Sequence, residues 1–172
     1  MVISSPASRG HTKRRLLRRL AVLTTALALP IVALAGPASA EQQCRAGNGA
    51  VVCLSIDGLA NSTYAVHIGI DVSMSRQDAQ AIIDAPGDPV SARVLGADTF
   101  DDNLFSVPLT AVWASAESGL SAEFDIIVNP FQLDEDDAPG DRGDEVFGRV
   151  RFVDPRTNTS RTFNTPEIHR DF

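Results

Sequence analysis

The densest group of chemically reactive side chains lies between residues 134 and 145, where seven acids surround one arginine. Carboxylates this close repel one another, and a hard cation such as Ca²⁺, which takes roughly six to eight oxygen ligands, would neutralise them. The glycine and closing glutamate of an EF-hand loop are absent, and a solvated acidic loop is the favoured interpretation. The calcium candidates, and the only cofactor indicated, are therefore Asp134, Asp136, Asp137, Asp141 and Asp144.

Arginines are concentrated after this acidic segment, since five of the nine that follow residue 40 lie within residues 149–172. Arg149 and Arg151 lie on the same face of an expected strand, and Arg161 lies on the expected hairpin partner of that strand. Guanidinium groups form paired hydrogen bonds with the oxygens of carboxylates and phosphates. We therefore take these three residues as anion-binding candidates for an acidic sugar or a phosphate. Charge balance against neighbouring acids is the alternative explanation of the same cluster.

No catalytic residue can be assigned from motifs. His67 and His169 are the only histidines after residue 40, and neither lies in a recognisable catalytic pattern. The GxSxG, HExxH and glycine-rich phosphate-loop patterns are all absent. A triad assembled from residues far apart in the sequence stays open as an alternative.

The two cysteines, Cys44 and Cys53, flank Asn48-Gly49, the dipeptide preferred in two-residue hairpin turns. Counting outward from that turn pairs Cys44 directly with Cys53 at a non-hydrogen-bonded position. The Cα atoms of such a pair lie about 4.5 Å apart, which is inside the range that a disulfide spans. The sequence therefore predicts a hairpin closed by a disulfide bond.

Alternation of apolar and polar residues predicts most of the remaining elements. The pattern is strongest at 64–72, 120–128 and 146–153, and weaker strands are expected near 51–57, 89–95, 104–114 and 160–168. Pro108 lacks a backbone N–H, so the strand that contains it should lie at a sheet edge or carry a bulge.

One segment has helical spacing instead. Ser75 and Asp78 resemble an N-terminal cap, and Ala79, Ile82 and Ile83 share one face, which predicts a short helix from Arg76 to Asp84. About seven antiparallel strands and one helix predict a mainly β fold. The expected architecture is an antiparallel β-sandwich of immunoglobulin-like size, formed by a single domain over residues 41–172.

Residues 1–40 have the order of a cleaved signal peptide. A basic stretch precedes an apolar run over 20–35, and Ala38-Ser39-Ala40 is a small-x-small cleavage site. That run is shorter than the roughly 20 residues that cross a bilayer. We expect a secreted protein that begins near Glu41, with an uncleaved anchor as the alternative. Arg14-Arg15 leaves both the general secretory and the twin-arginine routes open.

The charge of residues 41–172 limits the partners. This region holds nine arginines, no lysine and all 22 acids, so its net charge is −13. Such a charge argues against nucleic acids and anionic membranes, and the residue usage is typical of a GC-rich bacterial genome. We expect a secreted binding or interaction module with an extracellular or cell-wall partner. A small extracellular hydrolase and a secreted inhibitor or toxin are the alternatives.

Overall fold

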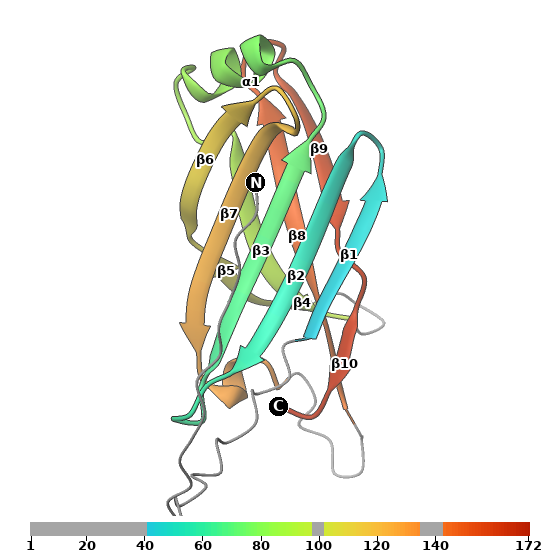
Figure 1. Cartoon of the computed structure of the whole chain (residues 1–172). Helices are drawn as coiled ribbons and strands as arrows, with labels where there is room; N and C mark the ends of the chain where they lie inside the picture. The colour runs from blue at the N-terminus through green and yellow to red at the C-terminus, as the bar shows by residue number, and fades with distance from the viewer. Residues whose placement is uncertain (1–40, 98–101, 135–142) are drawn as a thin grey trace, which may run out of the picture. The chain divides into compact units, whose positions relative to one another are not determined.

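The computed structural model describes residues 41–97, 102–134 and 143–172. The described chain is mainly β, with two antiparallel sheets and one α-helix (Figure 1). Sheet A has the strand order β1-β2-β3-β7-β6. Its strands are β1 (Glu41–Gly47), β2 (Ala50–Gly58), β3 (Tyr64–Val72), β6 (Leu109–Ser115) and β7 (Gly119–Val128).

Sheet B has the strand order β10-β8-β4-β5, and β9 also pairs with β8. Because β9 and β10 pair with successive stretches of β8, together they form one interrupted edge of the sheet. The strands are β4 (Val90–Gly96), β5 (Asn103–Val107), β8 (Asp144–Asp154), β9 (Thr159–Asn164) and β10 (Ile168–Arg170).

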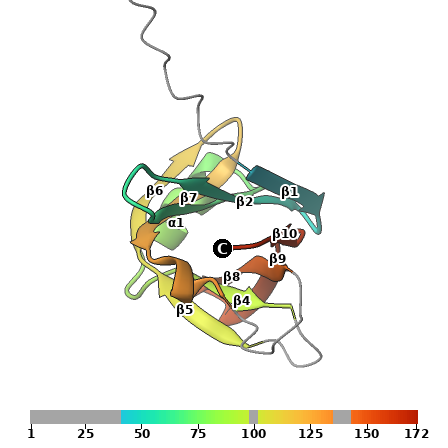
Figure 2. The same cartoon turned by 90° about the horizontal axis from the view of Figure 1, so that it is seen from below.

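The core lies between the facing sides of the two sheets (Figure 2). Leu54, Ile68 and Phe124 of sheet A are fully buried, as are Val94 and Val150 of sheet B. These residues occupy every second position of their strands, so the alternation that predicted the strands also identifies the side that packs. The remaining alternate residues form the outer face of each sheet.

The predicted hairpin is present with the predicted register. Gly47 pairs with Ala50, and Cys44 pairs with Cys53. A disulfide joins the two cysteines, whose Cα atoms lie 4.1 Å apart. Asn48 and Gly49 both have positive φ, as the two-residue turn requires. This hairpin forms one edge of sheet A.

The strand expected at 104–114 is instead two strands, β5 and β6, separated by Pro108. β5 belongs to sheet B and β6 to sheet A, so the chain changes sheets at the proline. Both strands lie at sheet edges, and the register of β6 shifts between Leu109 and Ala111. The expectation of an edge or a bulge is confirmed, but the continuous strand is wrong because Pro108 ends the pairing.

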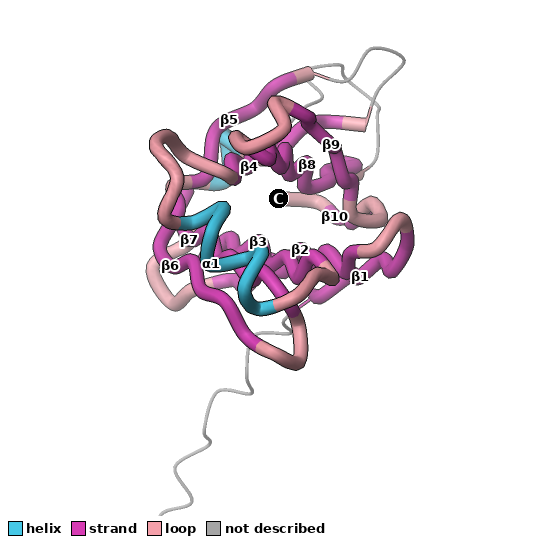
Figure 3. The backbone as a smooth tube through the Cα atoms, turned by 90° about the horizontal axis from the view of Figure 1, so that it is seen from above, coloured by secondary structure: helices cyan, strands magenta, loops and turns pink. Residues whose placement is uncertain are grey.

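The helix α1 (Arg76–Ile83) lies at one end of the sheets and contacts β6 and β7 (Figure 3). Ser75 caps it as predicted, since Ser75 Oγ accepts a hydrogen bond from the Asp78 backbone N–H at 3.0 Å. Ala79 and Ile82 are buried. A short 3-10 helix, η1 (Pro130–Gln132), follows β7. Within the described ranges, no helix is long and apolar enough to cross a bilayer.

Arg156, in the turn between β8 and β9, connects this end of sheet B to the helix. Its guanidinium forms two hydrogen bonds of 3.0 Å with the carboxylate of Asp154 and one of 2.8 Å with Asp78 Oδ1. The hydrogen bonds from Arg156 lower the pKa of Asp154. The pKa of Asp78 is lowered first by the hydrogen bond from Ser75 and then by that from Arg156.

Candidate functional site

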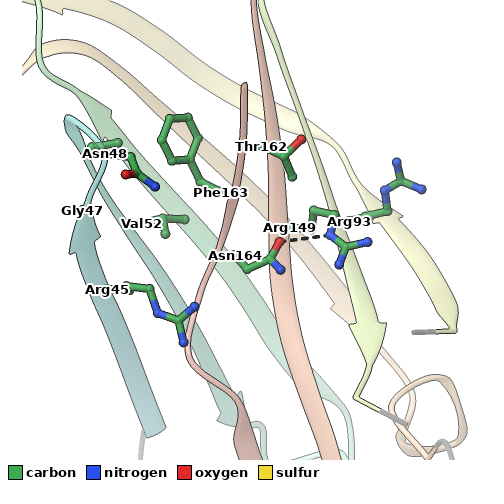
Figure 4. Close-up of a pocket in the computed structure, with 10 residues that line it drawn as sticks. Arg45, Gly47, Asn48, Val52, Arg93, Arg149, Thr162, Phe163 and Asn164 are labelled. Carbon is green, nitrogen blue, oxygen red and sulfur yellow. Dashed lines mark hydrogen bonds between the residues drawn. The ribbon is translucent and has the colours of Figure 1, made fainter. Parts of the chain in front are cut away.

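A cleft of about 570 Å³ opens where the β1–β2 hairpin lies beside the edge strand β9 (Figure 4). Its size falls in the range of small-molecule sites. Side chains alternate along β9, so Phe163 faces the core while Thr162 and Asn164 point to the other side. The cleft therefore has walls on both sides of this strand. It is lined by Arg45, Gly47, Asn48, Ala50, Val52, Arg93, Arg149, Thr162, Phe163 and Asn164.

The charge of this lining is opposite in sign to that of the chain. Three arginines line the cleft, and no acidic residue does. Arg45 and Arg93 are exposed, and within the described ranges neither forms an ion pair with a carboxylate. Arg149 is half-buried, and its Nε donates a 3.0 Å hydrogen bond to Asn164 Oδ1 (Figure 4). That bond fixes the orientation of the guanidinium at the cleft wall.

The anion-binding candidates lie in three different places. Arg149 lines the cleft, whereas Arg151 lies two residues further along β8 on the exposed outer face of sheet B. Arg161 pairs with Phe152, so it lies on the core side of β9. Its guanidinium lies over the rings of Phe152 and Phe163 and donates a 3.2 Å hydrogen bond to the carbonyl of Asn48. Arg161 thus connects β9 to the hairpin across the gap between the sheets.

Arg45 and Arg93 were not predicted as site residues. Both are distant in sequence from the cluster at the end of the chain, and only the pairing of β4 with β8 brings Arg93 beside Arg149. Arg45 enters the site because the β1–β2 hairpin lies next to β9. The hairpin register was available from the sequence, but its position against β9 was not.

A second group of functional side chains lies on the outer face of sheet A. His67 of β3 lies between two carboxylates of β7, with Nδ1 at 2.7 Å from Asp125 Oδ1 and Nε2 at 2.8 Å from Glu123 Oε2. Gly69 leaves room for the second contact, because a Cβ at this position would lie 3.1 Å from Glu123 Oε2. Glu123 Oε2 is buried and accepts no hydrogen bond. It lies within ion-pair distance of His67 Nε2, but the geometry of this contact is poor for a hydrogen bond.

The two carboxylates next to His67 respond oppositely to the fold. Burial raises the pKa of Glu123, and the charge of His67 opposes this effect. The pKa of Asp125 is lowered, first by the hydrogen bond that Thr110 donates to it at 2.6 Å and then by the bond with His67. Neighbouring carboxyls with divergent pKa values are a known arrangement in acid–base catalysis, so this cluster must be weighed as a second candidate site.

Hydroxyl groups lie near this cluster, but among the described residues none forms a hydrogen bond with His67. Ser55 of β2 pairs with His67 across the strands, and Thr110 donates its hydrogen bond to Asp125. Ser121 Oγ donates to Asp71 Oδ1 at 2.5 Å. His67 contacts carboxylates only, and so does His169, which lies 3.1 Å from Glu145 and 3.6 Å from Glu167. Among the described residues, neither histidine forms a hydrogen bond with a hydroxyl group.

The calcium candidates are described only in part. Asp136, Asp137 and Asp141 lie outside the described residues, while Asp134 is exposed after η1. Asp144 is buried at the start of β8 and accepts a 3.2 Å hydrogen bond from the backbone N–H of Phe172. Among the described residues, no group of three or more potential ligands is arranged to hold a metal ion. The calcium site stays a sequence-based prediction.

No protein family, curated protein or solved structure matches this chain.

Proposed function

We propose that this protein is a secreted β-sandwich of immunoglobulin-like size that binds an anionic ligand in the cleft between the β1–β2 hairpin and β9. The observation that carries the proposal is the lining of that cleft: three arginines and no acids, in a region whose net charge is −13. An anion that enters the cleft gains charge-assisted hydrogen bonds from guanidinium groups, which are stronger than bonds between neutral groups.

The uncharged lining defines the ligand further. Asn48, Thr162 and Asn164 offer amide and hydroxyl groups, and Val52 and Phe163 supply the apolar part of the lining, on the core side of β9. Such a mixture suits a molecule that carries both hydroxyl groups and an anionic group, because each kind of group finds a complementary side chain. An acidic sugar has this composition.

Secretion is the second component of the proposal. The disulfide between Cys44 and Cys53 is consistent with an oxidising compartment outside the cytosol. The signal-peptide pattern of residues 1–40 would direct export of the chain from the cytosol. Together they favour an extracellular or cell-wall ligand over a cytosolic one.

A hydrolase is less well supported than a binding module, because His67 and His169 contact carboxylates rather than hydroxyl groups. No observation on the described residues favours an inhibitor or toxin. The anion-binding cleft therefore stands as the proposed function, without catalysis.

The test is a titration of the ¹⁵N-labelled protein with galacturonate, followed by amide chemical shifts. We expect saturable shifts centred on Asn48, Thr162 and Asn164, and about a tenfold weaker affinity for Arg45→Gln, the loss typical of one hydrogen bond to a charged group. Arg76→Gln, on α1 and away from the cleft, is the control because it removes the same charge. No saturation, or equal losses in both variants, would refute the proposal.

A further inference from the structure

The positive charge of the cleft continues onto the outer face of sheet B. Arg93 of β4 and Arg149 of β8 are directly paired across the two strands, and Arg151 lies two residues further along β8. Residues two apart on a strand point to the same face. The three arginines therefore form one cluster, of which Arg93 and Arg149 line the cleft and Arg151 lies beyond it.

Two guanidinium groups of this cluster are open to an anion. Within the described ranges, no carboxylate forms an ion pair with Arg93 or Arg151, although the region contains 22 acids. These two guanidinium groups are therefore available for charge-assisted hydrogen bonds with an anion.

Polar, uncharged residues flank the arginines in register. Across four strands, Ser106 of β5 pairs with Arg93, Arg93 with Arg149, and Arg149 with Asn164 of β9. Two residues further along β8, Arg151 pairs with Ser91 of β4 on one side and with Thr162 of β9 on the other. Each of these two rows of paired residues across the sheet therefore combines guanidinium groups with hydroxyl or amide groups. With strands about 4.8 Å apart, four strands span roughly 14 Å.

We propose that the ligand is a linear acidic polysaccharide, which enters the cleft with one anionic unit and extends across the outer face of sheet B to Arg151. This inference rests on the proposed function of the cleft. The repeated anionic groups pair with the arginines, and the sugar hydroxyls bond to the intervening serine, threonine and asparagine side chains.

A nucleic acid fits the same face less well. Single-stranded nucleic acids bind through exposed aromatic rings on which bases stack. The exposed aromatic residues of the described chain are Trp113 of sheet A and Phe131 of η1, and neither lies on sheet B. Single-stranded DNA is therefore a suitable competitor in the test.

The experiment compares galacturonate with hexagalacturonate by isothermal titration calorimetry at low salt. For the unmodified protein, we expect the hexamer to bind at least tenfold more tightly than the monomer, because it reaches the arginine beyond the cleft. In Arg151→Gln that ratio should fall about tenfold, which corresponds to one charge-assisted hydrogen bond. Arg76→Gln should leave the ratio unchanged.

The two proposals fail differently. If the monomer binds and Arg45→Gln weakens it, but Arg151→Gln leaves the ratio intact, the cleft binds single anions and the polysaccharide inference is wrong. If neither sugar binds, the proposed function fails as well. If Arg76→Gln lowers the ratio equally, the attraction is non-specific and the inference is wrong.

An oligodeoxythymidylate or a poly(glycerol phosphate) that binds more tightly than hexagalacturonate would replace the polysaccharide as the ligand class.

Discussion

Glu123 and Asp125 lie two residues apart on β7 and contact the same histidine, yet their environments have opposite effects on ionisation. Burial disfavours the charge of Glu123 and raises its pKa, whereas hydrogen bonds from Thr110 and His67 favour the charge of Asp125 and lower its pKa. A carboxyl whose pKa is lowered by folding stabilises the protein when ionised. A carboxyl whose pKa is raised stabilises it when protonated, and that contribution disappears as the pH rises.

These signs predict opposite pH dependences for two neutral variants. Asp125→Asn should be less stable than the unmodified protein at neutral pH, by at most about 1 kcal/mol because Asp125 is half exposed. The difference should disappear as the pH falls below the usual aspartate value of 3.8. Glu123→Gln should gain stability relative to the unmodified protein as the pH rises through the raised pKa of Glu123. Urea unfolding between pH 3 and pH 8 measures both, and parallel pH profiles for the two variants would contradict the assignment.

At the scale of residues, the sequence predicted what depends on local order and missed what depends on pairing between distant strands. Arg149 was found because β8 alternates cleanly. Arg93 was missed because its neighbour across the sheet is 56 positions away in the chain. The contact between His67 and Asp125 spans 58 positions, and no motif marks it.

At the scale of elements, the β1–β2 hairpin shows how far a local rule extends. The Asn48-Gly49 turn sets the register, the register pairs Cys44 with Cys53, and the structure contains that disulfide. The switch of the chain between sheets at Pro108 was beyond the same reasoning. A missing N–H shows that regular pairing stops, but which sheet the next strand joins is decided by the packing of the whole core.

Replacing both cysteines tests the energetic contribution of the hairpin. In the chain-entropy account, closing a loop of about ten residues stabilises the folded state by roughly 2–3 kcal/mol. The double variant Cys44→Ser/Cys53→Ser should lose about that much free energy of unfolding, as measured by urea denaturation. The unmodified protein under reducing conditions provides the control and should show a similar loss. An unchanged free energy in both samples would mean that the disulfide contributes little.

The approach of the two sheets depends on Gly148 of β8. A Cβ here would lie 3.1 Å from Ile68 Cδ1 of sheet A and 3.2 Å from Thr165 Cγ2, and the Gly148 N–H donates a 2.8 Å bond to Thr165 Oγ1. Gly148→Ala should therefore overpack the core and cost about 1–3 kcal/mol. Gly47→Ala is the matched control, since no atom lies within 4 Å of the added carbon. Equal stabilities of the two variants in thermal unfolding would show that the sheets have room to adjust.

At the scale of the whole molecule, charge is distributed unevenly between the two sheets. The outer face of sheet A carries Asp71, Glu123 and Asp125. The outer face of sheet B carries Arg93, Arg149 and Arg151, with Glu145 at the start of β8. The net charge of −13 for residues 41–172 hides this separation, because it sums over both faces. The net charge therefore gives no sign of the local cluster of arginines on which the proposed function depends, and the prediction that nucleic acids and anionic membranes are not partners stays a prediction.

Export is the property of the whole chain that the sequence predicts most directly. If residues 1–40 are a signal peptide, a bacterial host that expresses the full chain should release a protein whose N-terminal sequence is Glu-Gln-Gln-Cys, beginning at Glu41. Its intact mass should be two hydrogens lower than that of the reduced chain, because the disulfide forms after export. Ala38→Asp and Ala40→Asp should block processing, since signal peptidases require small residues at these positions. A retained protein that still carries residues 1–40 would instead identify the segment as an anchor.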